Sequence, residues 1–161
     1  MAAAAPRSKT DDERETLKLA DALTHVLDEC RMVLPGIQAL FGFQMIAVFN
    51  DGFSRKLGAF EQRLHIVAIV LVVVAIALLM APAALHREAE PKMASDRFLR
   101  VATRMLLAAM FPLAVSIAAE VFIVTDMVWH DPAAAASVAA AVGALFLVLW
   151  FVYPVIYRRT A

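Results

Sequence analysis

The stretch Ile66–Met80 reads IVAIVLVVVAIALLM, fifteen consecutive residues without a single polar side chain. A helix that packs on the core of a water-soluble protein keeps a polar face, so this run is typical of a helix surrounded by lipid. Three more stretches are long and apolar enough to cross a bilayer, which takes about 20 residues. The predicted spans are 32–49, 64–85, 101–129 and 133–157. They predict an all-α fold class, a four-helix transmembrane bundle in a lipid bilayer.

Composition supports this class and argues against catalysis. Hydrophobic residues make up 62% of the 161 residues, and the mean hydropathy is +0.73, both outside the usual range of soluble domains. The segments between the spans are too short for a soluble catalytic domain. The chain carries no phosphate-binding glycine loop, no nucleophile beside a base and no zinc-type pairing of Cys and His. We therefore expect no enzyme activity, no cofactor, no metal site and no nucleic-acid partner.

Basic residues are shared unevenly between the two sides of the predicted membrane. Twelve of the fifteen Lys and Arg residues lie before the first span, around the second loop or after the last span, and three lie in the first loop. The positive-inside rule then places both termini, including the tail 158–161, in the cytoplasm. We expect a multi-pass protein of the cell inner (plasma) membrane. The segment 1–9 lacks a cleavable signal, so the first span is expected to be an uncleaved anchor.

The segment before the first span is predicted to have two parts. Residues 1–9 are expected to be disordered, and Thr10–Glu13 is a capping box that begins a cytoplasmic amphipathic helix over 10–31. Leu34–Gly36 is expected to break this helix from the membrane domain 32–157. The apolar stripe of the amphipathic helix comprises Leu19, Leu23, Val26, Leu27 and Cys30, and its other faces are mainly acidic.

An acidic amphipathic helix is poorly suited to a membrane surface, because helices that lie on anionic lipid are rich in Lys and Arg. We therefore expect residues 10–31 to contact protein, in preference to lying along the membrane surface. The contact surface is either the basic second loop of the same chain or another molecule. A homo-oligomer, or a membrane or cytoplasmic protein partner bound through 10–31, is the partner that the sequence predicts.

Short connections predict that neighbouring spans are antiparallel. Asn50–Gly52 is a turn signal after the first span, and Phe53–Phe60 suits a short interfacial segment. Only His130–Pro132 separates the third and fourth spans, which must form a hairpin in direct contact. Small residues dominate the first half of the fourth span and permit close helix approach, whereas 145–157 is bulky. We expect this hairpin to be tight near its turn and wider toward the C-terminus.

Glu120 is the sharpest functional candidate, because a polar group inside the apolar layer costs free energy unless it has a partner. At 1.5 Å per residue it lies roughly 9 Å from the middle of its span, still within the hydrocarbon layer. Ser116 and Pro112 precede it at four-residue steps on one stripe. Two interpretations stay open. Glu120 is a proton- or cation-binding carboxylate, or, as we favour, a protonated side chain hydrogen-bonded to Gln44 or to a backbone carbonyl.

Further polar residues occur on the first and second spans. Gln38 and Gln44 are six residues apart and therefore point to different faces, and interhelical hydrogen bonding is the expected role. His86 ends the second span, where capping of helix carbonyls and extension toward the interface are sufficient reasons for its presence. His65 begins the second span on the same side as Glu120.

A cluster of ionisable residues lies at the outer end of the third span. A metal or proton site made of His65, Glu120, Asp126 and His130 is conceivable, but the spacing matches no ligand motif. Helix caps and headgroup contacts explain these residues better. Asp126 is the exception to test, because it lies on the inner edge of the cluster.

Several stretches together resemble an uncharacterised bacterial family of small four-span membrane proteins, over nearly all of 28–157. The matching pieces are Arg31–Phe43, Phe49 with Phe53, Ala81–Arg87, Arg100–Arg104 and Val124–Asp126. Some members of that family carry an automatic sodium/proton antiporter label. Glu120 stands where the family pattern has an apolar residue. The resemblance therefore raises Asp126, Gln38 and His86 relative to Glu120.

Three functions compete at this point, and the sequence favours the first over the other two. The first is a non-enzymatic, oligomerising structural or accessory subunit whose acidic N-terminal helix contacts protein. The second is a proton-coupled cation carrier, which with only four spans would act as an oligomer through membrane carboxylates. The third is a lipid-headgroup sensor that uses the basic second loop. A water-accessible cavity reaching Glu120 would favour the carrier over the other two.

Overall fold

The computed structural model describes residues 9–89 and 95–160, and every long element in these ranges is a helix. The elements are α1 (Lys9–Val48), α2 (Asp51–Lys56), α3 (Ala59–Ala89), α4 (Asp96–Trp129), α5 (Pro132–Leu147), the π-helical segment η1 (Val148–Val152) and α6 (Tyr153–Thr160). Four segments are long and apolar enough to cross a membrane: Leu17–Val48, Ala59–Glu88, Asp96–Trp129 and Pro132–Arg159. The predicted all-α class with four candidate spans is confirmed.

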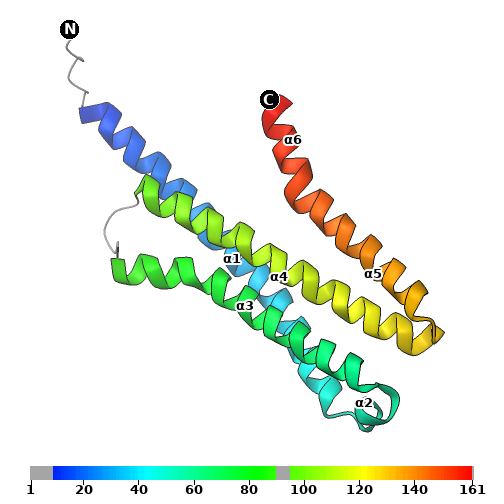
Figure 1. The fold of residues 1–161 in the computed structure, drawn as a ribbon. Helices are drawn as coiled ribbons and strands as arrows, with labels where there is room; N and C mark the ends of the chain where they lie inside the picture. Colours follow the sequence, from blue (N-terminus) through cyan, green and yellow to red (C-terminus); the bar gives the residue numbers. More distant parts are fainter. Residues whose placement is uncertain (1–8, 90–94, 161) are drawn as a thin grey trace.

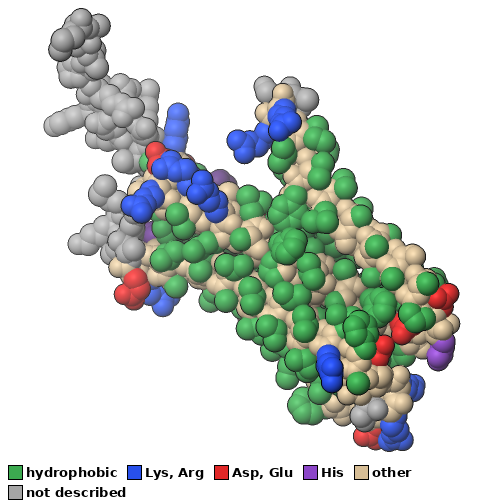
Figure 2. All heavy atoms as spheres, viewed as in Figure 1, with side chains coloured by type: hydrophobic (Ala, Val, Ile, Leu, Met, Phe, Trp, Pro, Cys, Tyr) green, Lys and Arg blue, Asp and Glu red, His purple; other side chains and the backbone are tan. Residues whose placement is uncertain are grey.

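Helices α1, α3 and α4 pack together, and α5 packs on α4 (Figure 1). The start of α1, the end of α3 and the end of α6 lie toward one end of the molecule, which we call the termini end. Helix α2 and the turn between α4 and α5 lie at the opposite end, called the α2 end. Apolar side chains cover the long middle of the molecule, with Lys and Arg toward its ends (Figure 2). This distribution suits a helix bundle whose middle is in contact with lipid.

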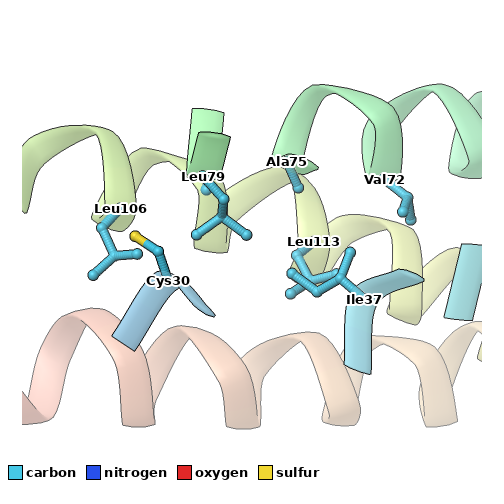
Figure 3. Close-up of a cluster of buried hydrophobic side chains, with 8 residues drawn as sticks. Cys30, Ile37, Val72, Ala75, Leu79, Leu106 and Leu113 are labelled. Atoms are coloured by element: carbon cyan, nitrogen blue, oxygen red, sulfur yellow. The ribbon is translucent and has the colours of Figure 1, made fainter. Parts of the chain in front are cut away.

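An apolar core fills the space between α1, α3 and α4. Figure 3 shows Cys30 and Ile37 of α1 among side chains of the two other helices. The core is formed by Cys30, Ile37, Val72, Ala75, Leu79, Leu106, Ala109 and Leu113. Small residues, Ala75 and Ala109, alternate with branched ones, which lets the helices approach closely without leaving gaps.

The expected break at Leu34–Gly36 is wrong, because α1 is one continuous helix with Pro35 inside it. Proline removes one backbone hydrogen bond and bends a helix, but packing on both sides can hold such a helix together. Pro35 and Gly36 are exposed, whereas Ile37 is buried in the core. The predicted boundary between an amphipathic helix 10–31 and a separate first span is therefore not a structural boundary.

The apolar stripe of α1 contacts the same chain. Leu23 is buried against Phe98 and Ala102 of α4, and Val26 and Leu27 pack beside it. Of the two predicted contact surfaces, the same chain and another molecule, these residues contact the same chain. The contact is made by the first turns of α4, just after the second loop. Helix α1 begins at Lys9, one residue before the predicted Thr10, which is within the usual uncertainty of helix ends. The rest of the segment expected to be disordered, 1–8, lies outside the described residues.

Side-chain caps set the remaining helix boundaries. The Asn50 side chain accepts from the Gly52 amide at 2.9 Å and begins α2, which occupies the predicted interfacial segment. Ser95 caps α4 through the Phe98 amide at 3.1 Å. Asp131 caps α5, and His130 adopts the left-handed conformation that ends α4. The predicted hairpin of the third and fourth spans is confirmed.

Helix α5 lies close to α4 near their turn and diverges from it toward the C-terminus (Figure 1). Ala135 is fully buried, and a Cβ atom at Gly143 would lie 3.8 Å from the Ala118 Cβ atom, an ordinary contact. The bulky residues of η1 and α6 are mostly exposed. The prediction of a tight turn side and a wider C-terminal side is confirmed by this arrangement.

Candidate functional site

Four polar side chains from three helices meet between the apolar core and the α2 end. Gln44 lies near the end of α1, His65 near the start of α3, and Ser116 and Glu120 one turn apart on α4. Because α3 runs antiparallel to α1 and α4, these three helix segments lie at the same depth of the bundle. We call Gln44, His65, Ser116 and Glu120 the polar network.

The Glu120 carboxylate contacts two members of the polar network. Its Oε1 atom accepts a hydrogen bond from Gln44 Nε2 at 2.9 Å and lies 2.9 Å from His65 Nδ1. Its Oε2 atom lies 3.2 Å from the same His65 nitrogen. The predicted hydrogen bond between Glu120 and Gln44 is confirmed. The histidine adds a second partner, so Glu120 belongs to a histidine–carboxylate pair.

The surroundings of the His65 ring determine where protons lie. The Nε2 atom is 3.0 Å from the backbone carbonyl oxygen of Gln44, which can only accept, so Nε2 carries a hydrogen. If His65 is an imidazolium, Nδ1 donates its hydrogen to the Glu120 carboxylate. If His65 is neutral, Nδ1 is bare and the carboxyl group of Glu120 must donate instead. In both arrangements one proton lies between Nδ1 and Glu120.

Ser116 links the polar network to the α3 backbone through a hydrogen bond. Its hydroxyl donates to the carbonyl oxygen of Ala68 at 2.9 Å and accepts from Gln44 Nε2 at 3.2 Å. The Gln44 amide therefore joins α1 to two side chains of α4. Phe53 of α2 contacts the His65 ring edge-on, with ring centroids 5.2 Å apart. All four helices that surround the site thus hold part of it in place.

The polar network is mostly shielded from the surroundings. Gln44 and His65 are each 3% exposed and Ser116 is fully buried, whereas the Glu120 side chain retains 20% exposure. One atom of the network has no partner: Gln44 Oε1 is buried and accepts no hydrogen bond. A buried acceptor without a donor costs about 1–3 kcal/mol.

A cavity of about 330 Å³ connects the pair with the α2 end. His65 and Glu120 line it together with Asn50, Phe53 and Lys56 of the α2 region. Toward the termini end, the buried core residues follow within two helical turns of the network. The pair is therefore reached from the α2 end, with packed apolar side chains behind it.

The other predicted site residues lie elsewhere. Gln38 is exposed on α1, away from the network. Asp126 lines a second, more polar cavity of about 760 Å³ with Arg55, Glu61 and His130. His86 is at the far end of α3, where its ring lies 5.6 Å from that of Phe98 and its Nδ1 atom is buried without a partner. Of the predicted residues, the structure thus unites Glu120, Gln44, Ser116 and His65.

The conceivable four-residue metal or proton site is only partly assembled. Within residues 9–89 and 95–160, no three His, Cys, Asp or Glu residues are grouped so that they could hold a metal ion. Of the four candidates, His65 and Glu120 meet, while Asp126 and His130 line the second cavity. A proton site built on the pair alone is compatible with this geometry.

Sequence reasoning did not place Phe53 and Lys56 at the site. Both belong to the short segment that was expected at the interface, and the pattern there gave no indication that α2 folds over the start of α3. It also did not show that the Gln44 backbone carbonyl faces His65. The only available signal was that Asn50 and Gly52 force a sharp turn directly before these residues.

Comparison with known proteins assigns a family. A family model described as a family of unknown function, DUF6328, matches residues 12–154. The chain belongs to this family. No curated protein and no solved structure matches the DUF6328 chain. The match is consistent with the resemblance to an uncharacterised family, whereas the bacterial origin and the antiporter label that the resemblance implied stay predictions.

Proposed function

We propose that this protein is a proton-coupled carrier of small cations in the membrane and that His65 and Glu120 form its coupling site. The observation that carries the proposal is the placement of both ring nitrogens of His65 opposite oxygen acceptors, next to a cavity. In this proposal the pair shares one proton between Nδ1 and the carboxyl group. The cavity gives that proton a path to and from one side of the membrane.

Loss of this proton converts the pair into a cation site. The bare Nδ1 atom and the carboxylate, 2.9 Å apart, are then two acceptors with no hydrogen between them. Their repulsion is relieved either by taking the proton back or by placing a cation beside the carboxylate. Proton and cation therefore compete for one position, which is the requirement for exchanging one against the other.

The predicted orientation gives this exchange a direction. With both termini in the cytoplasm, as the distribution of Lys and Arg predicts, the α2 end and its cavity face the outer side. Four spans are few for a carrier acting alone, so we propose a homo-oligomer in the inner membrane. The core behind the network then has to loosen in a second state that opens toward the cytoplasm.

Reconstitution into liposomes with an internal pH dye tests the proposal. We expect an external pulse of sodium, tetramethylammonium or guanidinium chloride to raise the internal pH in wild-type liposomes for at least one cation. Glu120→Gln should abolish the response, because an amide cannot exchange the shared proton. The control is Asp131→Asn, the same acid-to-amide change at an exposed helix cap, where Asn caps equally well. Responses no larger than those of empty liposomes for all three cations would refute the carrier.

The accessory-subunit role is the second candidate, supported by the acidic face that α1 keeps after its apolar stripe has packed on α4. Asp21 and Glu29 are exposed on this face. A protein that binds there would present basic residues. We expect Asp21→Lys with Glu29→Lys to release such a protein from the purified complex. A pull-down whose protein content is the same for wild type and the double variant would exclude this role for the acidic face.

A further inference from the structure

The cavity beside the histidine–carboxylate pair is far larger than a bare ion requires. Its volume of about 330 Å³ is roughly ten times the volume that one water molecule takes up in the liquid. It lies at the lower end of the range of sites for organic ligands, which are concave and mainly apolar with a few polar groups. The cavity therefore has room for an organic ligand.

The walls of the cavity are mainly apolar. They are formed by Ala47, Phe53, Leu57, Ile123, Val124 and Met127. The phenyl ring of Phe53 and the flexible thioether of Met127 adapt to ligands of different shape and contact apolar or cationic groups well. A bare alkali ion would gain nothing from such walls, whereas a cation with an apolar body would be desolvated favourably there.

The polar end of the cavity favours a cation that carries N–H donors. The Glu120 carboxylate offers two oxygen atoms side by side, the arrangement that guanidinium and ammonium groups bind through paired hydrogen bonds. Gln44 does not line the cavity, so the carboxylate is the acceptor that a ligand meets there. A cation with two or more N–H groups can donate to both of its oxygen atoms. A quaternary ammonium group has no hydrogen to donate.

We propose that the site binds a small organic cation with N–H donors and an apolar body, such as an alkyl- or arylguanidinium. This inference rests on the proposed function and names its substrate class. In the binding step, the pair gives its shared proton to water through the cavity, and the cation takes its place at the Glu120 carboxylate. The charge of the site stays the same, since one positive charge leaves as another enters.

The charged groups that line the cavity are Lys56 from α2, His65 from α3 and Glu120 from α4. Lys56 is exposed at the α2 end, so its charge is screened by water and salt, while the carboxylate is partly enclosed. The adjoining cavity holds two acidic residues, Glu61 and Asp126, together with Arg55 and His130, and shares the Lys56 side chain with the first. The approach to the site is thus of mixed charge, and Glu120 provides the negative charge next to the pair.

Calorimetric titration of the full-length protein in non-ionic detergent with benzylguanidinium chloride tests the proposal. We expect saturable binding that weakens at least tenfold in Glu120→Gln and is unchanged in Asp131→Asn. Affinity should rise roughly fourfold for each methylene group from methyl- to propylguanidinium, because apolar surface is buried. In Glu120→Gln each member of this series should bind at least tenfold more weakly than it binds to wild type. Titration in two buffers of different ionisation enthalpy should show proton release for each cation bound.

Several results would overturn the proposal. Equal uptake of benzyl alcohol would show unspecific partition into the apolar walls or the micelle. Equal binding by wild type and Glu120→Gln would place the ligand elsewhere. If sodium releases the proton and benzylguanidinium does not bind, the substrate class is wrong while proton-coupled exchange stands. If neither cation releases a proton, and liposomes show no response either, the proposed function fails as well.

Discussion

Replacement of Glu120 by Gln and by Ala should affect stability very differently. In Glu120→Gln, the new amide oxygen can occupy the Oε1 position and keep the 2.9 Å bond from Gln44 Nε2. The new amide nitrogen then lies at the Oε2 position, 3.2 Å from His65 Nδ1, and donates to this nitrogen while Nε2–H still donates to the Gln44 carbonyl. Both partners of the side chain are kept without the shared proton, but the amide has to turn so that its oxygen moves away from the bare Nδ1 atom, which is 2.9 Å from the Oε1 position. We expect a loss of less than about 1 kcal/mol.

Glu120→Ala removes the acceptor of two interhelical contacts, those with Gln44 and His65. Interhelical hydrogen bonds in membranes contribute about 0.6 kcal/mol on average and up to about 1.7 kcal/mol. His65 is almost fully buried and loses the partner of Nδ1, so its contribution lies toward the upper limit. We expect a total loss of about 2 kcal/mol, which corresponds to roughly a 30-fold change in the unfolding equilibrium.

Equilibrium unfolding in mixed micelles, with the denaturing detergent varied and helix content followed by circular dichroism, measures both free energies of unfolding. Asp131→Asn serves as the matched control. If Glu120→Gln is as destabilised as Glu120→Ala, the carboxylate charge itself holds the helices together. The shared-proton description of the pair would then be wrong.

Three other substitutions test separate parts of the structure. Ser116→Ala removes the bond to the Ala68 carbonyl and the bond from Gln44, and should cost about 1 kcal/mol in the same unfolding assay; unchanged stability would contradict these bonds. Leu23→Ala, at a side chain 5% exposed, should cost about 2–3 kcal/mol and speed hydrogen exchange in the first half of α1; unaltered exchange would mean that this half is not docked on α4. Lys56→Gln should speed cation association severalfold at low salt and less at high salt, as measured by stopped flow; a salt-independent rate would exclude an electrostatic role for Lys56.

The fold followed from the sequence because lipid leaves few alternatives. A run such as Ile66–Met80 can only be a spanning helix, and connections as short as that around His130 force antiparallel neighbours. The predicted helix break at Pro35 is wrong because it rested only on the low helix propensity of proline. Leu23 packs on α4 before Pro35 and Ile37 packs in the core after it, so tertiary contacts hold one continuous helix.

Part of the site could be predicted because burying a polar group without a partner costs free energy. A buried carboxyl group needs a partner, and Gln44 was the nearest candidate in depth, which gave the bond from Gln44 to Glu120. The pairing with His65 was not resolved, because spacing along a helix gives the face on which a residue lies but not the rotation of one helix against another. The resemblance favoured Asp126, Gln38 and His86, and the structure places each of them outside the polar network.

The unbroken first helix connects the polar network with a distant acidic stretch. Its 40 residues extend over about 60 Å, twice the thickness of the hydrocarbon layer. Gln44, near the C-terminal end of α1, donates a hydrogen bond to Glu120. The acidic stretch around Asp21 lies about 35 Å from Gln44 along the helix axis. Packing of Leu23 on α4 and of Ile37 in the core holds the parts before and after Pro35 in one rod. A shift of this rod along its axis at Gln44 would therefore reach the acidic stretch at full size.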